Sequence, residues 1–139
     1  MNSRENKARV GRFFAAMSAR DFDAMAAFMA PDHRFYFPLS PEPLDAEAHV
    51  AMNRQFGEAV EQLQWTIEEQ LVDGDKVATR GYITGVHNGE FNGLPPTGNP
   101  VRVNYINIIQ LREGLSVNEW DSMDTFALMQ QLGAVPAPE

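Results

Sequence analysis

The order of helical and strand-like segments constrains the fold of this chain more than any other feature. Apolar residues recur at helical spacing in the first half, whereas the second half has four long strand-like segments, 63–72, 76–87, 101–112 and 115–123. The connections 73–75 and 112–114 each contain a glycine and are short enough to be tight turns. Helices followed by long strands predict an α+β fold, with helices packed on one face of a curved antiparallel sheet.

Three helices are expected before the long strands. The first runs from Ser3 to Ala19, with apolar residues at i, i+3, i+4 and i+7, namely Val10, Phe13, Phe14 and Met17. Asp21 and Asp45 are suited to capping a second and a third helix, and a short strand at 33–37 separates these two. A short segment at 126–132 and a tail at 135–139 complete a single domain of 1–139.

Composition excludes several classes of function. A net charge of −8 disfavours nucleic acid, because affinity for the phosphate backbone comes mainly from lysine and arginine. The chain has 0 cysteines, which excludes disulfides and thiolate chemistry, and its 3 histidines lack the spacing of a metal site. No apolar run reaches the length of a membrane span, and no apolar core of a signal peptide follows Met1. We therefore expect a cytoplasmic protein that binds neither metal nor membrane.

The last two strands carry polar residues at positions that predict a ligand pocket. Residues 101, 103, 105, 107, 109 and 111 share one face of their strand, and both faces mix apolar and polar side chains. Such a sheet is expected to meet helices or a cavity on one side and a partner subunit on the other. If no bulge interrupts the last strand, one face carries Asn118, Trp120, Ser122 and Asp124. An aromatic floor with a carboxylate at its rim is typical of a pocket.

Asp124 is the leading candidate for a catalytic acid or base. A carboxylate beside tryptophan and methionine loses hydration, which raises its pKa toward the range useful for proton transfer. The alternative is that Asp124 caps the helical segment that follows it, which is an ordinary use of aspartate. Asp121 has the opposite parity in the strand and is expected in solvent or at a dimer surface.

Other residues are candidates for supporting roles. His87 lies at a strand end, where it can act as a base or electrophile or be an exposed turn residue. Tyr36 and Tyr105 can donate a hydrogen bond to a carbonyl or enolate oxygen, although a buried tyrosine with a backbone partner is more common. Asn107 is notable because asparagine is depleted in strands. Phe14 and Trp120 are candidates to hold an apolar substrate.

Three motifs taken together resemble the SnoaL-like polyketide cyclases of the nuclear-transport-factor-two-like superfamily. The first spans residues 84–98 and reads TGVHNGEFNGLPPTG; the others are Trp120 with Asp124, and the sequence QQLG at 130–133. The resemblance extends from the N-terminal helices to Gly133. It implies a cone-shaped half-barrel whose N-terminal helices close an internal cavity for a small molecule, and a homodimer packed through the sheet.

The resemblance also implies an activity. Such cyclases close a ring on an aromatic polyketide by an intramolecular aldol step that needs no cofactor, with an aspartate at the position of Asp124 as acid and base. His87 matches the histidine of the first motif. Asn118 stands where the family often has glutamate, and Tyr36 stands where it often has histidine.

We therefore expect a cofactor-independent lyase or isomerase acting on a small, mostly apolar carbonyl compound. Two alternatives stay open at this point. One is a non-catalytic binding protein with the same pocket, and the other is an epoxide-hydrolase-like enzyme, which requires a second carboxylate and an arginine such as Arg80 or Arg102.

Overall fold

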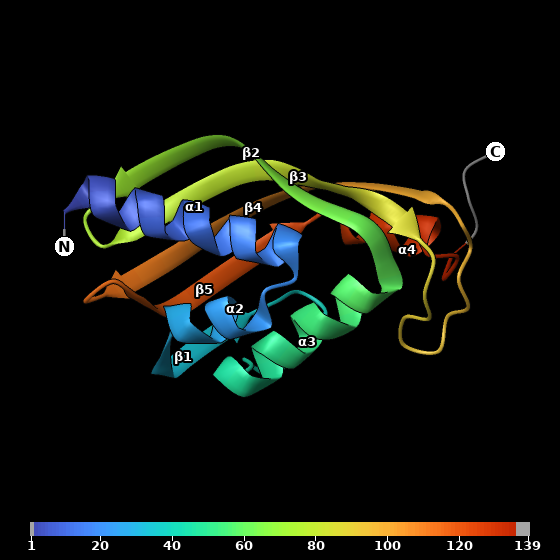
Figure 1. Ribbon diagram of the computed structural model, residues 1–139, viewed down its shortest axis with the longest axis horizontal. Helices are drawn as coiled ribbons and strands as arrows, with labels where there is room; N and C mark the ends of the chain where they lie inside the picture. Colours follow the sequence, from blue (N-terminus) through green and yellow to red (C-terminus); the bar gives the residue numbers. More distant parts are fainter. Residues whose placement is uncertain (1, 136–139) are drawn as a thin grey trace.

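The computed structural model describes residues 2–135 and consists of four helices and five strands (Figure 1). In chain order the elements are α1 (Ser3–Ala19), α2 (Phe22–Phe28), β1 (Met29–Tyr36), α3 (Ala46–Ala59), β2 (Val60–Asp73), β3 (Lys76–His87), β4 (Pro100–Arg112), β5 (Leu115–Met123) and α4 (Thr125–Gln131). The tail predicted at 135–139 lies, apart from Val135, outside the described residues. No helix among the described residues is long and apolar enough to cross a membrane.

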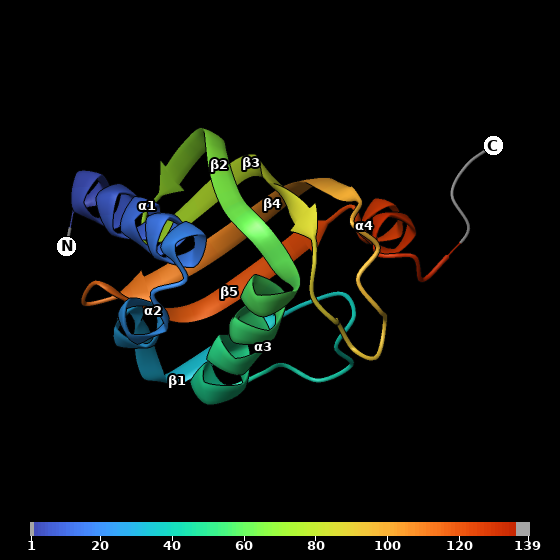
Figure 2. The same ribbon diagram turned by 45° about the vertical axis from the view of Figure 1, so that its right-hand side comes forward.

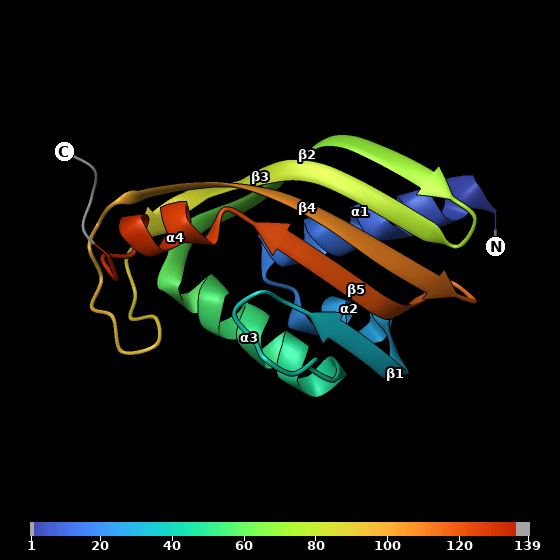
Figure 3. The ribbon, with the colours of Figure 1, turned by 180° about the vertical axis from the view of Figure 1, so that it is seen from behind.

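The strands form one curved sheet in the order β1-β5-β4-β3-β2. Neighbouring strands are antiparallel, except that β1 pairs with β5 in parallel. Helices α1, α2 and α3 cover one face (Figure 2), and the view from behind shows β4 and β5 without helices over them (Figure 3). The predicted α+β class, with N-terminal helices over a curved sheet, is confirmed. The parallel pairing of β1 was not expected, and it arises because the chain crosses over through α3, β2, β3 and β4 before β5 returns beside β1.

The predicted helices form where their capping residues and apolar spacing place them. Asp21 and Asp45 cap α2 and α3, each accepting a hydrogen bond from a backbone N–H three residues later. The apolar stripe of α1 is buried against the sheet: Val10, Phe13, Phe14 and Met17 are all nearly inaccessible. Burial of such large side chains contributes about 1.5–3 kcal/mol each, so this stripe fixes α1 on the inner face of the sheet.

A β-bulge near the start of β5 decides which side chains face the helices. Leu111 pairs with Ser116, but the next residue back, Gln110, pairs with Asn118, so that Val117 has no partner on β4. One extra residue in a strand moves every later side chain to the opposite face relative to its partner strand. Asp121 consequently pairs with the inward-facing Asn107, and Trp120 pairs with the outward-facing Ile108.

Gly81 in β3 allows β2 to approach closely at a second irregularity of the sheet. A Cβ atom added there would lie 1.9 Å from the carbonyl oxygen of Thr66 and 2.7 Å from the hydroxyl of Tyr105. The two neighbours are also bonded to each other, because the Tyr105 hydroxyl donates a hydrogen bond to that same backbone carbonyl. Glycine is therefore required here by space.

We expect Gly81→Ala to destabilise the fold by about 1–3 kcal/mol or more, the usual cost of overpacking. Gly11→Ala is the matched control, since its Cβ would meet no atom within 4 Å on α1. That change should raise stability by about 0.5–1 kcal/mol, because alanine is the better helix former. Urea denaturation of both variants measures the difference, and equal effects would contradict the close approach at Gly81.

Candidate functional site

The inner face of the sheet, α3, α4 and two loops enclose a cavity of about 290 Å³. Its walls are mostly apolar, with Met52 and Phe56 from α3, Leu128 and Met129 from α4, and Phe37, Leu39, Phe91 and Leu94 from the loops. Trp65 on β2 adds an aromatic wall, and its indole N–H is buried without a hydrogen-bond partner among the described residues. Small-molecule sites typically have this form, an apolar pocket with a few directed polar groups.

Two carboxyl groups on β5 provide the acidic part of the cavity wall. Glu119 and Asp121 are two residues apart, and both point to the inner face of the sheet. Oε1 of Glu119 and Oδ1 of Asp121 are sealed from solvent and have no hydrogen-bond partner within the described chain. Both polar atoms of the Asn107 side chain, which lies opposite Asp121 on β4, are in the same state. Buried polar atoms normally find partners, so these atoms leave hydrogen-bonding capacity unused beside the cavity.

Burial changes the titration of both acids. It raises the pKa of Asp121 to about 6, while contact with Glu119 and Asn107 works in the opposite direction. Burial raises the pKa of Glu119 well above its usual range, and the neighbouring charge of Asp121 raises it further. Two carboxyls this close cannot both ionise easily. The pair is therefore expected to share one proton near neutral pH, rather than to ionise fully.

A histidine lies at the far side of Glu119. Nε2 of His49, on α3, is 3.9 Å from Oε2 of Glu119, and the imidazole lies nearly parallel to the ring of Phe35, with 3.7 Å between ring centroids. Burial lowers the pKa of His49 well below its usual range, so the ring is neutral. No group of three or more metal-ligating side chains gathers anywhere in residues 2–135.

The structure places Asp124 away from this cavity. Its side chain accepts a hydrogen bond of 3.0 Å from the backbone N–H of Ala127 and caps α4, which is the alternative that the sequence left open. Asp124 is exposed and borders an open groove on the outer face of the sheet, together with Arg80, Asn104 and Ser122. The bulge turns this face of β5 outward, so it does not form the floor of the inner cavity.

Trp120 and Tyr36 also lie on the outer face. Their rings stack at 5.7 Å between centroids, and both side chains are more than a third exposed. Neither borders the inner cavity. Asp121, expected in solvent or at a dimer surface, instead contributes to the cavity wall. The substrate-binding roles predicted for Trp120 and Tyr36 stay predictions, and their positions do not support them.

The other predicted residues divide between the core and the site. Phe14 and Tyr105 stack at 5.4 Å in the core, and the tyrosine hydroxyl donates to a backbone carbonyl, its more common use. His87 is fully buried, and its Nδ1 lies 2.9 Å from the hydroxyl of Thr97 at the base of the loop 88–99. Of all the predicted site residues, only Asn107 lies against the acid pair.

Sequence reasoning missed Glu119, Asp121, His49 and Trp65 as site residues. A signal for the acid pair was present: Asn107 lies on the apolar face of β4, and its cross-strand partner on β5 had to share that face. Finding that partner required the position of the bulge, which no residue type in the turn 112–115 reveals.

Comparison with known proteins identifies the family. Residues 8–132 match the family described as SnoaL-like polyketide cyclase, and the chain belongs to this family. No curated protein matches the sequence significantly.

Solved structures share the whole fold. AclR from Streptomyces galilaeus, a proposed hydroxylase, has a TM-score of 0.89 at 25% identity, over 99% of this chain and 87% of that one. A proposed SnoaL-like polyketide cyclase from Jannaschia sp. CCS1 has a TM-score of 0.84 at 28% identity, over 95% and 94%. IdmH from Streptomyces antibioticus, a proposed polyketide cyclase, has a TM-score of 0.76 at 28% identity, over 92% and 98%.

The raised pKa of Asp121 predicts a specific dependence of stability on pH. The native chain binds this proton up to about pH 6, whereas the unfolded chain releases it near 3.8. The group's contribution to the free energy of unfolding therefore falls as pH rises from about 4 to 6, by at most about 3 kcal/mol.

Asp121→Asn removes this titration, so the stability of the variant relative to the wild type should rise across that same pH range and then level off. Urea denaturation at a series of pH values measures the difference. A difference that does not change between pH 4 and 6 would show that Asp121 titrates as an exposed carboxyl.

Proposed function

We propose that this member of the SnoaL-like polyketide cyclase family is a cofactor-independent cyclase or isomerase in which Asp121 and Glu119 transfer protons inside the inner cavity. The observation that carries this proposal is the acid pair with its unpartnered, buried oxygens on the wall of an otherwise apolar cavity. A carboxylate in such surroundings is a stronger base than one in water, and its titration lies near the operating pH.

The proposed reaction is an intramolecular aldol closure of an aromatic, polyketide-like carbonyl compound. The Asp121 carboxylate takes a proton from the carbon next to a carbonyl; the C–H bond breaks, and its electron pair forms an enolate. The enolate carbon attacks a second carbonyl of the same molecule, and the resulting alkoxide takes the proton of Glu119. Transfer of the first proton from Asp121 to Glu119 restores the pair, so that atoms and charges balance over the cycle.

The remaining walls supply orientation and stabilise developing charge. The indole N–H of Trp65 is a donor without a partner in the described chain and can stabilise an enolate oxygen. Asn107 lies against Asp121 and supports its carboxylate. The apolar side chains hold the carbon skeleton and exclude water. No arginine or lysine lines the cavity as the described residues define it, which does not favour the epoxide-hydrolase-like alternative because that chemistry asks for an arginine beside the acids.

Two isosteric variants test the assignment. Asp121→Asn should keep ligand binding and lower turnover of aromatic carbonyl substrates by about 10²-fold or more, since a general base is lost. Asp124→Asn is the matched control, because asparagine caps a helix as well as aspartate does, and it should retain turnover close to that of the wild type. Turnover is followed by the change in absorbance on ring closure.

The opposite ranking of these variants would restore Asp124 as the acid and base. Ligand binding by the wild type without conversion of any such compound would favour the non-catalytic binding protein.

We further propose that a second copy of the chain packs on the outer face of the sheet. Cross-strand partners on this face form one apolar row over all five strands, consisting of Leu71, Ala78, Ile108, Trp120 and Tyr36. Ile106 extends the row and is 53% exposed. Arg80, Glu68 and Glu69 lie on the same side and give the surface both signs of charge, which is compatible with a self-complementary, two-fold interface. Residence in the cytoplasm stays a prediction.

Ile108→Glu places a charge at the centre of this row and should convert the dimer to a monomer, because burying an unpaired charge costs several kcal/mol. Phe126→Glu on α4 is the control, because Phe126 is an exposed apolar residue outside the row, and this variant should stay dimeric. Light scattering after size exclusion measures both masses. A monomeric wild type, or a dimer that survives Ile108→Glu, would contradict the proposed interface.

A further inference from the structure

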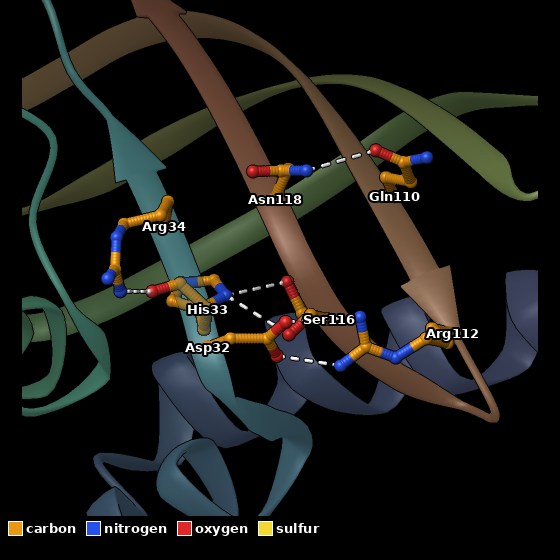
Figure 4. A network of polar contacts seen from close by, with 7 residues as sticks. All are labelled: Asp32, His33, Arg34, Gln110, Arg112, Ser116 and Asn118. Carbon is orange, nitrogen blue, oxygen red and sulfur yellow. Dashed lines mark hydrogen bonds and ion pairs between the residues drawn. The ribbon is translucent and has the colours of Figure 1, made fainter.

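Three buried polar residues, His49, His33 and Ser116, follow one another from the acid pair into the core. The proposed reaction assigns them no role. Nε2 of His33, on β1, lies 3.0 Å from Nδ1 of His49. Nδ1 of His33 lies 3.0 Å from the hydroxyl and 3.3 Å from the carbonyl oxygen of Ser116, on β5 (Figure 4). At the other end, His49 faces Glu119 at 3.9 Å. All four residues are at most 2% exposed.

Ser116 decides where the proton on His33 lies. Both of its oxygens can accept a hydrogen bond from an N–H at Nδ1, so a protonated Nδ1 is attracted to both. An unprotonated Nδ1 would instead direct its lone pair at the carbonyl oxygen, which can only accept. The geometry therefore favours His33 with its proton on Nδ1 and a lone pair on Nε2.

The orientation of His33 determines that of His49. Because Nε2 of His33 is an acceptor, the short contact of 3.0 Å requires Nδ1 of His49 to be the donor. A neutral His49 with its proton on Nδ1 has a lone pair on Nε2, and this atom faces Glu119. A lone pair in that position attracts the O–H of a protonated carboxyl and repels a carboxylate.

The surroundings keep both rings neutral. Burial lowers the pKa of His33 and of His49, and the neighbouring ring lowers that of His49 further. Phe13 and Phe35 pack against His49 as apolar neighbours. The charged groups nearest to His33 are Arg34, which donates to the carbonyl of His33 itself, and Asp32 on the same strand; they have opposite signs and opposite effects on the ring. On the side of Glu119, the acidic neighbour is Asp121.

We propose that His33 and His49 form a positioning relay in which the carbonyl of Ser116 fixes both tautomers and thereby keeps the proton of the acid pair on Glu119. The relay assigns the two acids different roles: Glu119 is held as the proton donor, and Asp121 is left as the base. The catalytic meaning of this assignment rests on the proposed function, whereas the tautomers and the protonation of Glu119 do not depend on it.

Nitrogen-15 NMR of the histidine rings tests the first step directly. In the full-length wild type at neutral pH, both His33 and His49 should show a protonated Nδ1 and an unprotonated Nε2. A proton on Nε2 of His49, or an imidazolium at either residue, would overturn the proposal. This measurement needs no substrate and no variant.

The second step predicts an effect at a distance. His33→Leu removes the acceptor that holds His49, so His49 can turn its N–H toward Glu119, and the carboxyl titration of Glu119 should move down by about one pH unit or more. Ser116→Ala is the matched control, since it keeps the carbonyl that orients His33, and it should leave that titration in place. Carbon-13 NMR of the Glu119 carboxyl follows both variants.

A purely structural role of the histidines predicts no such difference, and an unchanged Glu119 titration in a folded His33→Leu would overturn the relay. If that variant does not fold, the wild-type nitrogen spectrum still decides. If the histidine tautomers differ from those predicted, but turnover still requires Asp121, only this inference is refuted. The reverse result, intact tautomers with full activity of Asp121→Asn, would refute the proposed function alone.

Discussion

The arrangement of the site depends on one irregularity, the extra residue in β5 between Ser116 and Asn118. Without it, the register set by the turn after Arg112 would continue, and Trp120 would lie opposite Asn107 on the inner face of the sheet. With it, Asp121 takes that position, and Glu119 lies opposite the buried Ile109. The bulge therefore places Glu119 and Asp121 on the cavity side of the sheet, where an uninterrupted strand would place Trp120. At the bulge, Ser116 and Val117 are both buried, and Ser116 contacts His33.

The energetic consequence is that burial reduces the solvation of two neighbouring ionisable groups. Placing a lone carboxylate in such a site is costly, and the chain reduces the cost by keeping one acid protonated beside the other, with Asn107 and the two neutral histidines as polar neighbours. The cost that remains is stored in the folded state as a raised pKa, and that is the property a proton-transferring residue needs. The proposed acid–base chemistry and the predicted pH dependence of stability therefore have the same physical origin, the burial of the acid pair.

The sequence was sufficient for most of the fold but not for the site. Helical spacing and capping aspartates located α1, α2 and α3, and strict alternation in β4 matched the observed burial from Val101 to Leu111. The grouping of Trp120 with Asp124 on one face of β5 was also right; the side of the sheet was not. Alternation fixes which residues share a face, but the face itself follows from pairing with β4, and a single unpaired residue reverses it. The contacts among His33, His49 and Ser116 could not be predicted from the sequence for a similar reason. These residues meet only through the parallel pairing of β1 with β5 and the packing of α3.

The central claim is that chemistry takes place on the inner face of the sheet, at Asp121, rather than on the outer face, at Asp124. A crystal structure of the chain with a bound aromatic carbonyl compound tests it most directly. The account predicts that the ligand occupies the cavity between α3, α4 and β5, with its carbonyl-bearing carbon chain against the carboxyl of Asp121. A ligand held instead in the outer groove beside Asp124 and Arg80, with the inner cavity empty, would contradict it.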